Sequence, residues 1–304
     1  MSKIIEVRNF TKAFGDQLAV DNISFDVDEG SVFAFLGPNG AGKTTTINTL
    51  CTILEKTSGS LTIAGHDVNA DQAKVRRDIG IVFQESTLDT NLTVEENLSL
   101  HCEFYRVPKE EIRERIGFAL DLVGLLDRQK AMVKTLSGGM KRRVEIARGL
   151  VHFPKVLFLD EPTTGLDPQT RANIWDYICT VQKQKNMTIF MTTHYMDEAE
   201  ICDKVAIIDH GKLVAFDTPS QLKRMHTSDI VNIKTSDGIG LREYLRQNEI
   251  PYSEKDDLFM VQSRSIAVTL DLLSQRKDSI IDCEVHKGSL NDVFIAITGK
   301  GIRQ

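Results

Sequence analysis

The sequence lacks the features of secreted and membrane-spanning proteins. Its 304 residues include only five cysteines, widely separated and never in a C-x-x-C pair, which indicates a reducing cytoplasm and no structural disulfide. No apolar run approaches the ~18 residues of a spanning helix. The longest run is VFAFL at 32–36, and the N-terminus, MSKIIE, is charged where a signal peptide needs an apolar stretch. We therefore expect no membrane-spanning segment and no secretory leader.

An excess of positive charge is also missing. The chain carries 37 Lys and Arg against 43 Asp and Glu, a net charge of −6, so no global positive field attracts nucleic acid or anionic lipid. Residues 221–304 hold 12 basic and 12 acidic side chains, which places the whole net charge in residues 1–220. We expect no nucleic-acid partner.

The composition that is present, 41% apolar and 26% charged, is that of a globular protein, and the length suggests about two domains. Residues 1–35 alternate apolar and polar side chains as strands do, and 85–152 show long helical periodicity. Short strand-like runs alternate with helical stretches from 156 to 208, the rhythm of a parallel sheet with crossover helices. These patterns predict an α/β protein with an N-terminal antiparallel β subdomain and a helical subdomain.

A shift in composition near 218–219 predicts a domain boundary. Beyond it we expect a small α+β C-terminal domain at 221–304. Its expected helices are 219–226, 239–247, 265–275 and 289–298, and its expected strands are 230–234, 258–262 and 280–286.

The segment 37–44 reads GPNGAGKT, a G-x-x-x-x-G-K-T motif between an apolar strand and a helix. Glycines let the backbone N–H groups curl around a phosphate chain at a helix N-terminus. Lys43 can then reach the terminal phosphates and Thr44 can bind Mg²⁺. The predicted nucleotide-binding residues of this loop are Gly37, Pro38, Asn39, Gly40, Ala41, Gly42, Lys43, Thr44 and Thr45.

Two acids, Asp160 and Glu161, end the apolar run at 156–159. Taken alone, such a pair is most often a solvated strand end. Beside a phosphate loop in one sheet, Asp160 is predicted to hold Mg²⁺ and Glu161 to act as the base that orients or deprotonates water.

These motifs, together with LSGGM at 136–140, resemble the ATPase subunits of ABC transporters over residues 3–220. The resemblance implies a P-loop NTPase core in the segment that we take as the ATP-binding cassette, with the helical subdomain at about 85–152. It also implies that Ser137, Gly138 and Gly139 bind the nucleotide of an opposite subunit. A helix N-terminus with two glycines is a second anion site, which fits two copies that enclose ATP head to tail.

Four further residues match the family's functional positions. By resemblance, Gln84 contacts Mg²⁺ or the attacking water, His194 contacts the γ-phosphate, and Asp167 lies in the loop that signals across the dimer. Phe14 takes the place of an aromatic side chain, usually tyrosine, that stacks on adenine. Ordinary explanations exist for each: a polar strand end, a helix cap or core packing.

Within the family the chain looks most like the daunorubicin-resistance type of exporter ATPase, on the stretch TLSGGMKRR at 135–143 and the ending SLNDVFIAITG at 289–299. Met140 replaces the usual glutamine of the signature, and this change does not touch the phosphate chemistry. The resemblance implies ATP and Mg²⁺ as cofactors. It also implies a homodimer, or a heterodimer with a related ATPase, and a separate membrane permease that holds the chain at the inner face of the cell membrane.

The expected function is ATP hydrolysis that drives export of a drug or other amphipathic molecule. A soluble ABC ATPase acting outside transport is the alternative. The repair type separates its motifs with a long coiled coil, whereas Lys43 and Asp160 lie 117 residues apart, and the translation type carries two cassettes in one chain. A GTPase switch needs N-K-x-D, and the dipeptide Asn-Lys does not occur.

Overall fold

The structure is a computed structural model that describes residues 2–263 and 266–299. The chain divides into two compact units, residues up to 218 and residues from 219 onward. Among the described helices, none has the length and apolar character that crossing a bilayer requires.

The first unit is built on a six-stranded sheet in the order β10-β9-β3-β8-β7-β6. Five strands are parallel and β10 runs antiparallel to β9 at one edge. The sheet consists of β3 (Val32–Leu36), β6 (Ile79–Val82), β7 (Val156–Asp160), β8 (Thr188–Thr193), β9 (Lys204–Asp209) and β10 (Lys212–Asp217). Because β3, β7 and β8 are buried along their whole length, their sequences are mainly apolar runs, and those of β7 and β8 end in polar residues.

An antiparallel sheet, in the order β2-β1-β4-β5, flanks this core. It contains β1 (Lys3–Phe14), β2 (Gln17–Asp28), β4 (Ser58–Ile63) and β5 (His66–Asp67). The two sheets share one apolar core, in which Phe25 stacks on Phe33 with ring centroids 5.5 Å apart. Helix α1 (Lys43–Leu50) follows β3, and α2 (Gln72–Asp78) precedes β6.

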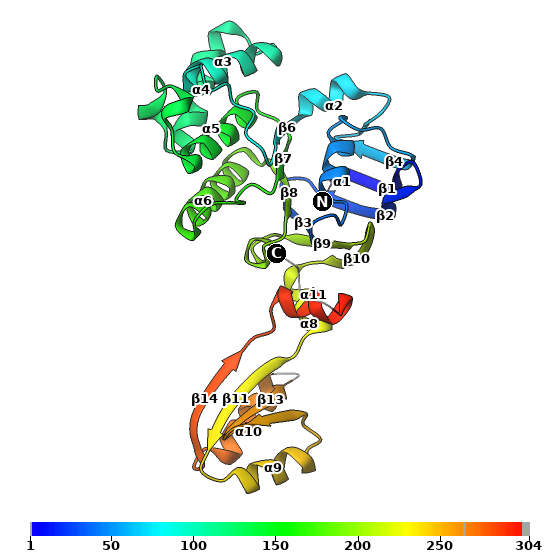
Figure 1. Cartoon of the computed structure of the whole chain (residues 1–304), viewed down its shortest axis with the longest axis vertical. Helices are drawn as coiled ribbons and strands as arrows, with labels where there is room; N and C mark the ends of the chain where they lie inside the picture. The colour runs from blue at the N-terminus through cyan, green and yellow to red at the C-terminus, as the bar shows by residue number, and fades with distance from the viewer. Residues whose placement is uncertain (1, 264–265, 300–304) are drawn as a thin grey trace. The chain divides into compact units, whose positions relative to one another are not determined.

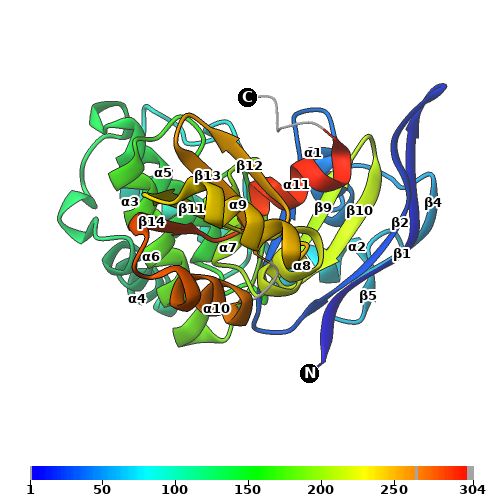
Figure 2. The same ribbon diagram turned by 90° about the horizontal axis from the view of Figure 1, so that it is seen from below.

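The helical part comprises α3 (Val94–Phe104), α4 (Lys109–Leu122), the short 3₁₀ turns η1 (Leu126–Arg128) and η2 (Val133–Thr135), and α5 (Gly138–Leu150). It lies across the central sheet from the antiparallel sheet (Figures 1 and 2). Helices α6 (Pro168–Lys185) and α7 (Met196–Glu200) connect the later strands. Thr93 and Glu96 form a capping box that starts α3, as the sequence T-x-x-E favours.

The second unit begins with α8 (Pro219–His226), which packs on the last helix, α11 (Leu290–Thr298). Between them lie β11 (Asp229–Thr235), α9 (Gly238–Gln247), β12 (Tyr252–Lys255), β13 (Leu258–Ser263), α10 (Ile266–Arg276) and β14 (Ile280–His286). The strands pair antiparallel in the order β12-β13-β11-β14. This βαββαβ arrangement is that of ferredoxin-like domains.

The sequence prediction of an α/β core with an antiparallel β subdomain, a helical subdomain and a small α+β unit is confirmed. The pattern overlooked α2, β5, β10 and β12. Strand β12 reads YSEK and is mostly exposed, so it shows no apolar alternation. Without β12 the βαββαβ order could not be recognised.

Candidate active site

The phosphate loop connects the buried strand β3 to α1. Gly42 is the N-cap residue of α1 and has φ 107°, a left-handed conformation that favours glycine. A Cβ at Gly37 would lie 2.3 Å from the carbonyl oxygen of Ile208, so no larger residue fits against β9. The loop therefore needs its glycines for backbone shape and for close approach to the sheet.

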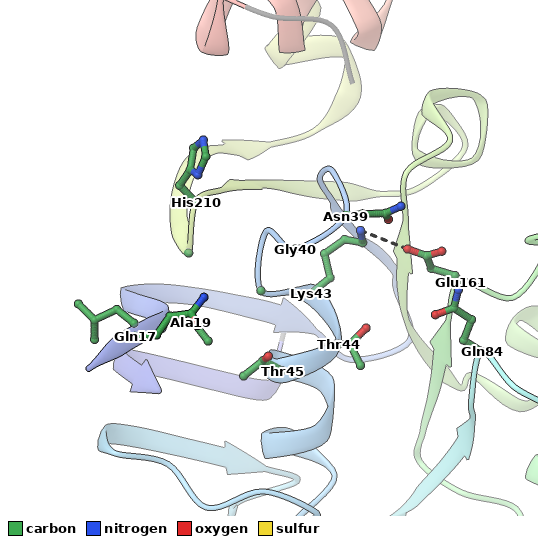
Figure 3. Close-up of a pocket in the computed structure, with 13 residues that line it drawn as sticks. Gln17, Ala19, Asn39, Gly40, Lys43, Thr44, Thr45, Gln84, Glu161 and His210 are labelled. Carbon is green, nitrogen blue, oxygen red and sulfur yellow. Dashed lines mark ion pairs between the residues drawn. The ribbon is translucent and has the colours of Figure 1, made fainter. Parts of the chain in front are cut away.

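Lys43 is buried, with its ammonium group folded into the loop. Its Nζ donates to the carbonyl oxygens of Gly37 at 2.9 Å and Pro38 at 3.1 Å. It also lies 3.2 Å from Oε1 of Glu161, as the dashed line in Figure 3 shows. The lysine thus has a carboxylate partner from β7, and a phosphate chain in the loop would meet the same ammonium.

Asp160 ends β7 next to the start of α1. Its Oδ1 accepts hydrogen bonds from Thr192 at 2.5 Å and from Thr44 at 3.4 Å. Burial raises the pKa of Asp160, although these two hydroxyl donors and Lys43 oppose the shift. The Thr44 hydroxyl and the Asp160 carboxylate therefore lie together, and hard oxygen donors of this kind suit Mg²⁺.

Glu161 follows in a left-handed backbone conformation, with φ 45°. This conformation is costly for a side chain larger than glycine, and such residues gather at functional sites. Burial alone would raise the pKa of Glu161, but Lys43, His194 and Thr164 together lower it. Glu161 is thus held as a carboxylate, whereas burial disfavours the charged form of its neighbour Asp160.

His194 reaches Glu161 from the end of β8. Its Nδ1 lies 3.2 Å from Oε2 of Glu161, but the angle is not that of a hydrogen bond. The imidazole also packs on Tyr195, with ring centroids 4.1 Å apart. Lys43 and His194 therefore converge on opposite oxygens of one carboxylate.

The loop that carries His194 is tied to the loop after β7 by Glu198 on α7. This side chain is 3% exposed and accepts hydrogen bonds from the Thr193 hydroxyl at 2.6 Å and from the Thr163 hydroxyl. The ends of β7 and β8 are thus joined by side chains as well as by the sheet.

A cavity of about 580 Å³ opens in front of the phosphate loop (Figure 3). Of the predicted residues, it is lined by Asn39, Gly40, Gly42, Lys43, Thr44, Thr45, Gln84 and Glu161. Gly37, Pro38 and Ala41 belong to the same loop. Asp160 and His194 do not line the cavity, but each contacts a residue that does, Thr44 and Glu161 respectively. The carboxyl ends of β3, β6, β7 and β8 thus place their residues at one edge of the sheet, where α/β proteins bind ligands.

The structure does not bring the signature residues to this cavity. Ser137 caps α5 by accepting from the N–H of Met140 at 3.3 Å, and Gly139 faces Thr170, whose Cγ2 would lie 2.9 Å from an added Cβ. Asp167 caps α6 through the same Thr170. Ser137, Gly138, Gly139 and Asp167 line no part of the cavity at the phosphate loop.

Phe14 also lies outside the cavity lining. It is 49% exposed at the end of β1, and the Lys12 ammonium lies 4.7 Å from its ring centroid. Its pairing partner across the sheet is Gln17, which does line the cavity. Its predicted stacking on adenine stays a prediction.

Five lining residues were not predicted from the sequence: Gln17, Leu18, Ala19, His210 and Gly211. They come from the start of β2 and from the turn between β9 and β10. His210 and Gly211 form a left-handed turn, with φ 47° and 76°, and the glycine is the local hint of this turn in the sequence. The backbone hydrogen bonds that bring these segments beside the phosphate loop join residues far apart in the sequence, so the local pattern could not predict the cavity wall.

Comparison with known proteins gives the family of the chain. A sequence model of the family described as "ABC transporter" matches residues 20–164. The chain is 34% identical to the "Daunorubicin/doxorubicin resistance ATP-binding protein DrrA" of Streptomyces peucetius, over 98% of this chain and 93% of the relative.

Two solved structures resemble this chain over most of its length. The cbiO1 protein of Clostridium perfringens, described as part of the ABC transporter complex cbiONQ, superposes with a TM-score of 0.69 and 30% identity, over 81% of this chain and 96% of the other. The ATP-binding cassette MJ0796, described as a dimer in a post-hydrolysis state with ADP and Pi, gives 0.64 and 29%, over 70% and 98%.

Proposed function

The chain belongs to the ATP-binding subunits of ABC transporters, of the daunorubicin-resistance type, and we propose that two copies enclose two ATP molecules head to tail. It is an ATPase of a drug-resistance or export-type transporter. The observation that carries the proposed mechanism of hydrolysis is the convergence of Lys43 and His194 on Glu161, each at 3.2 Å, beside the phosphate loop.

In this proposal Lys43 and the N–H groups of the loop bind the β- and γ-phosphates. Glu161 orients the attacking water and takes its proton as the O–P bond forms and the bond to the leaving ADP oxygen breaks. His194 contacts the γ-phosphate from the far side of Glu161. These roles require Glu161 to be a carboxylate close to Lys43 and His194. Both neighbours lower the pKa of Glu161 and so keep it ionised.

The residues present fit Mg²⁺. Thr44 and Asp160 lie within 3.4 Å of each other and Gln84 lines the same cavity, so they would hold the ion, which neutralises phosphate charge when bound. Among the described residues no cluster of three or more His, Cys, Asp and Glu forms a metal site. One carboxylate with hydroxyl, amide and phosphate oxygens is typical of Mg²⁺ bound with a nucleotide.

Two copies are supported by the positions of the signature residues. Ser137, Gly138 and Gly139 begin a helix whose N-terminus favours an anion, yet they line no part of this chain's own cavity. A second chain would complete the site, and MJ0796 is described as a dimer. We also propose that a separate membrane permease, contacted by the helical part, holds this chain at the inner face of the cell membrane. The description of cbiO1 as part of an ABC transporter complex supports such a partner.

The test uses Glu161→Gln, which should bind ATP but not turn it over. We expect this variant to become a dimer by light scattering when Mg²⁺ and ATP are added. Glu161→Gln combined with Ser137→Arg, which fills the signature site, should stay monomeric while it still binds ATP. A Glu161→Gln protein that stays monomeric when saturated with ATP would overturn the dimer.

A further inference from the structure

Arg142, on α5, has a buried guanidinium that contacts the backbone of two segments carrying predicted site residues, the one after β6 and the one at the end of β7. We propose that Arg142, together with Glu145, is a positioning pair that links the signature helix to Glu161 and Gln84 of the same chain. The roles of Glu161 and Gln84 rest on the proposed function. The contacts of the pair do not.

The guanidinium satisfies its donors on main-chain oxygens around β7. Arg142 Nε donates to the carbonyl oxygen of Pro162 at 2.6 Å, and Nη2 donates to those of Asp160 at 3.2 Å and Glu161 at 3.3 Å. Three successive carbonyl groups are thus held by one side chain. A guanidinium, with five donors fixed in a plane, can do this, whereas the three donors of an ammonium radiate from a point.

The same guanidinium reaches the segment after β6. Nη1 donates to the carbonyl oxygen of Phe83, next to Gln84, and lies 3.0 Å from Oε2 of Glu145. The other oxygen of Glu145 accepts from the N–H of Thr87 at 2.8 Å. The pair therefore holds the chain on both sides of Gln84.

These contacts bear on the strained backbone at Glu161. A residue with φ 45° persists only when its surroundings fix it, and the peptide groups before and after Glu161 are the ones that Arg142 holds. The bonds therefore help to set the direction in which Glu161 leaves the strand toward Lys43. The N–H of Glu161 is held separately by Thr192. Loss of the Arg142 bonds would therefore weaken, rather than remove, the restraint on this backbone and let the carboxylate move.

The pair also connects this geometry to the second anion site. Arg142 and Glu145 stand on α5, the helix that Ser137 caps. A phosphate bound at the N-terminus of α5 would move the helix or fix its position. Because Arg142 is bonded to the backbone at Glu161 and beside Gln84, the positions of these two residues would change with it. Occupation of the signature site by one ATP would thus reach the catalytic residues that face the other.

A purely structural explanation makes a different prediction. Arg142 is 7% exposed and Glu145 is 3% exposed, and loss of one partner leaves a buried charge unpaired. If the pair only stabilises the fold, a folded protein in which both charges are replaced by amides should turn over ATP at the wild-type rate. If it positions Glu161, turnover stays low although the protein is folded.

The experiment therefore compares Arg142→Gln/Glu145→Gln, Arg142→Lys and Arg143→Gln in the full chain. Arg143 is the matched control, because it stands next on the same helix but donates to the carbonyl oxygen of Val123 at 3.0 Å in the helical part. Steady-state kcat and KM, ATP affinity by calorimetry and thermal unfolding are measured for each. Glu161→Gln is measured beside them.

We expect the double variant to lower kcat at least about 30-fold, with ATP affinity within about threefold of wild type. The kcat of Arg142→Lys should lie between those of the double variant and wild type. Arg143→Gln should keep kcat within about twofold of wild type. A folded double variant with kcat within twofold of wild type would overturn the proposal, as would an equal loss in Arg143→Gln. If the double variant does not fold, Arg142→Lys decides: wild-type kcat in that variant refutes the role.

The role of Glu161 as the base and the role of the Arg142–Glu145 pair can be refuted separately. If Glu161→Gln hydrolyses ATP at the wild-type rate, the base assignment in the proposed function is wrong. If Glu161→Gln is inactive but the Arg142 variants turn over normally, only the positioning pair is wrong.

Discussion

The two units treat charged side chains in opposite ways. The first unit buries Lys43, Arg142, Glu145, Asp160, Glu161 and Glu198. In the second unit, the buried polar side chains among the described residues are two hydroxyls, Ser263 and Thr269, which bond to each other at 2.8 Å. Burying a charge costs free energy even when it is paired. The unit that keeps six such groups is therefore organised for chemistry, whereas the other is organised around an apolar core.

The second unit shows what a fold needs without such chemistry. Its core packs side chains of the sheet, such as Val231 and Phe259, against Leu241 and Leu245 of α9. Asp237 caps α9, and Ser289 with Asp292 forms a capping box at α11. Leu290, Val293 and Phe294 are buried on one face of α11. Helix caps and an apolar core thus account for the fold of this unit, and none of its described charged side chains is buried.

The largest effect should come from the buried carboxylate of the first unit. We expect Glu161→Gln to lower kcat about 10²–10⁴-fold, because the amide cannot take a proton from water. ATP binding should remain. The exposed Glu103→Gln on α3 serves as control, and ordinary turnover in Glu161→Gln would show that the buried charge does not serve catalysis.

A smaller loss is expected from the buried cation. Lys43→Ala should weaken ATP binding about 100-fold, about 3 kcal/mol, because a desolvated charge facing phosphate is removed. Calorimetry would measure the dissociation constant. Lys155→Ala, which removes a lysine 57% exposed and paired with Asp78, should leave it unchanged. Equal affinities in the two variants would contradict the phosphate-loop assignment.

Two half-buried histidines away from the site give a third test of the first unit. Burial lowers the pKa of His101 to about 3 and that of His152 to about 4, from an ordinary 6.5. In the fold, His152 Nε2 donates to the carbonyl oxygen of Ile79 at 2.8 Å, which leaves the buried Nδ1 without a partner. Protonation would add an unsatisfied donor there.

Because the folded pKa values lie below the unfolded one, the stability from these histidines is complete above about pH 6.5 and is lost as the pH falls toward 4. His152 alone should cost about 2 kcal/mol of unfolding free energy between pH 7 and pH 5. Urea unfolding of wild type and His152→Gln at both pH values measures this. The same pH slope in both proteins would contradict it, and His210→Gln, 89% exposed at its side chain, is the control.

The smallest effect should come from a charged pair of the second unit. Arg242 donates to both oxygens of Glu254, at 2.9 and 2.7 Å, but the side chains are 41% and 31% exposed. Arg242→Gln should therefore change the unfolding free energy by less than about 1 kcal/mol and leave ATP turnover unchanged. A loss as large as that of the buried groups would break the contrast between the units.

Much of the site could be predicted from local sequence. The motif at 37–44 and the acids after 156–159 carry their own signal, because a phosphate loop and a buried strand end are local structures. The role of Arg142 could not be predicted, since the main-chain oxygens to which it donates lie 18 to 59 residues away in the sequence. The cavity walls at Gln17 and His210 were missed for the same reason.

Most of the secondary structure, the phosphate loop and the identity of the chemical groups could be predicted from the sequence, because each follows from periodicity or spacing along a short stretch. The tertiary structure was needed to show that Lys43 and His194 meet on Glu161, that Glu161 takes a left-handed backbone, and that Arg142 holds the peptides around it. It also decided the βαββαβ order of the second unit. These features depend on which distant strands pair, and that pairing is set by the burial of the whole core and not by any local pattern.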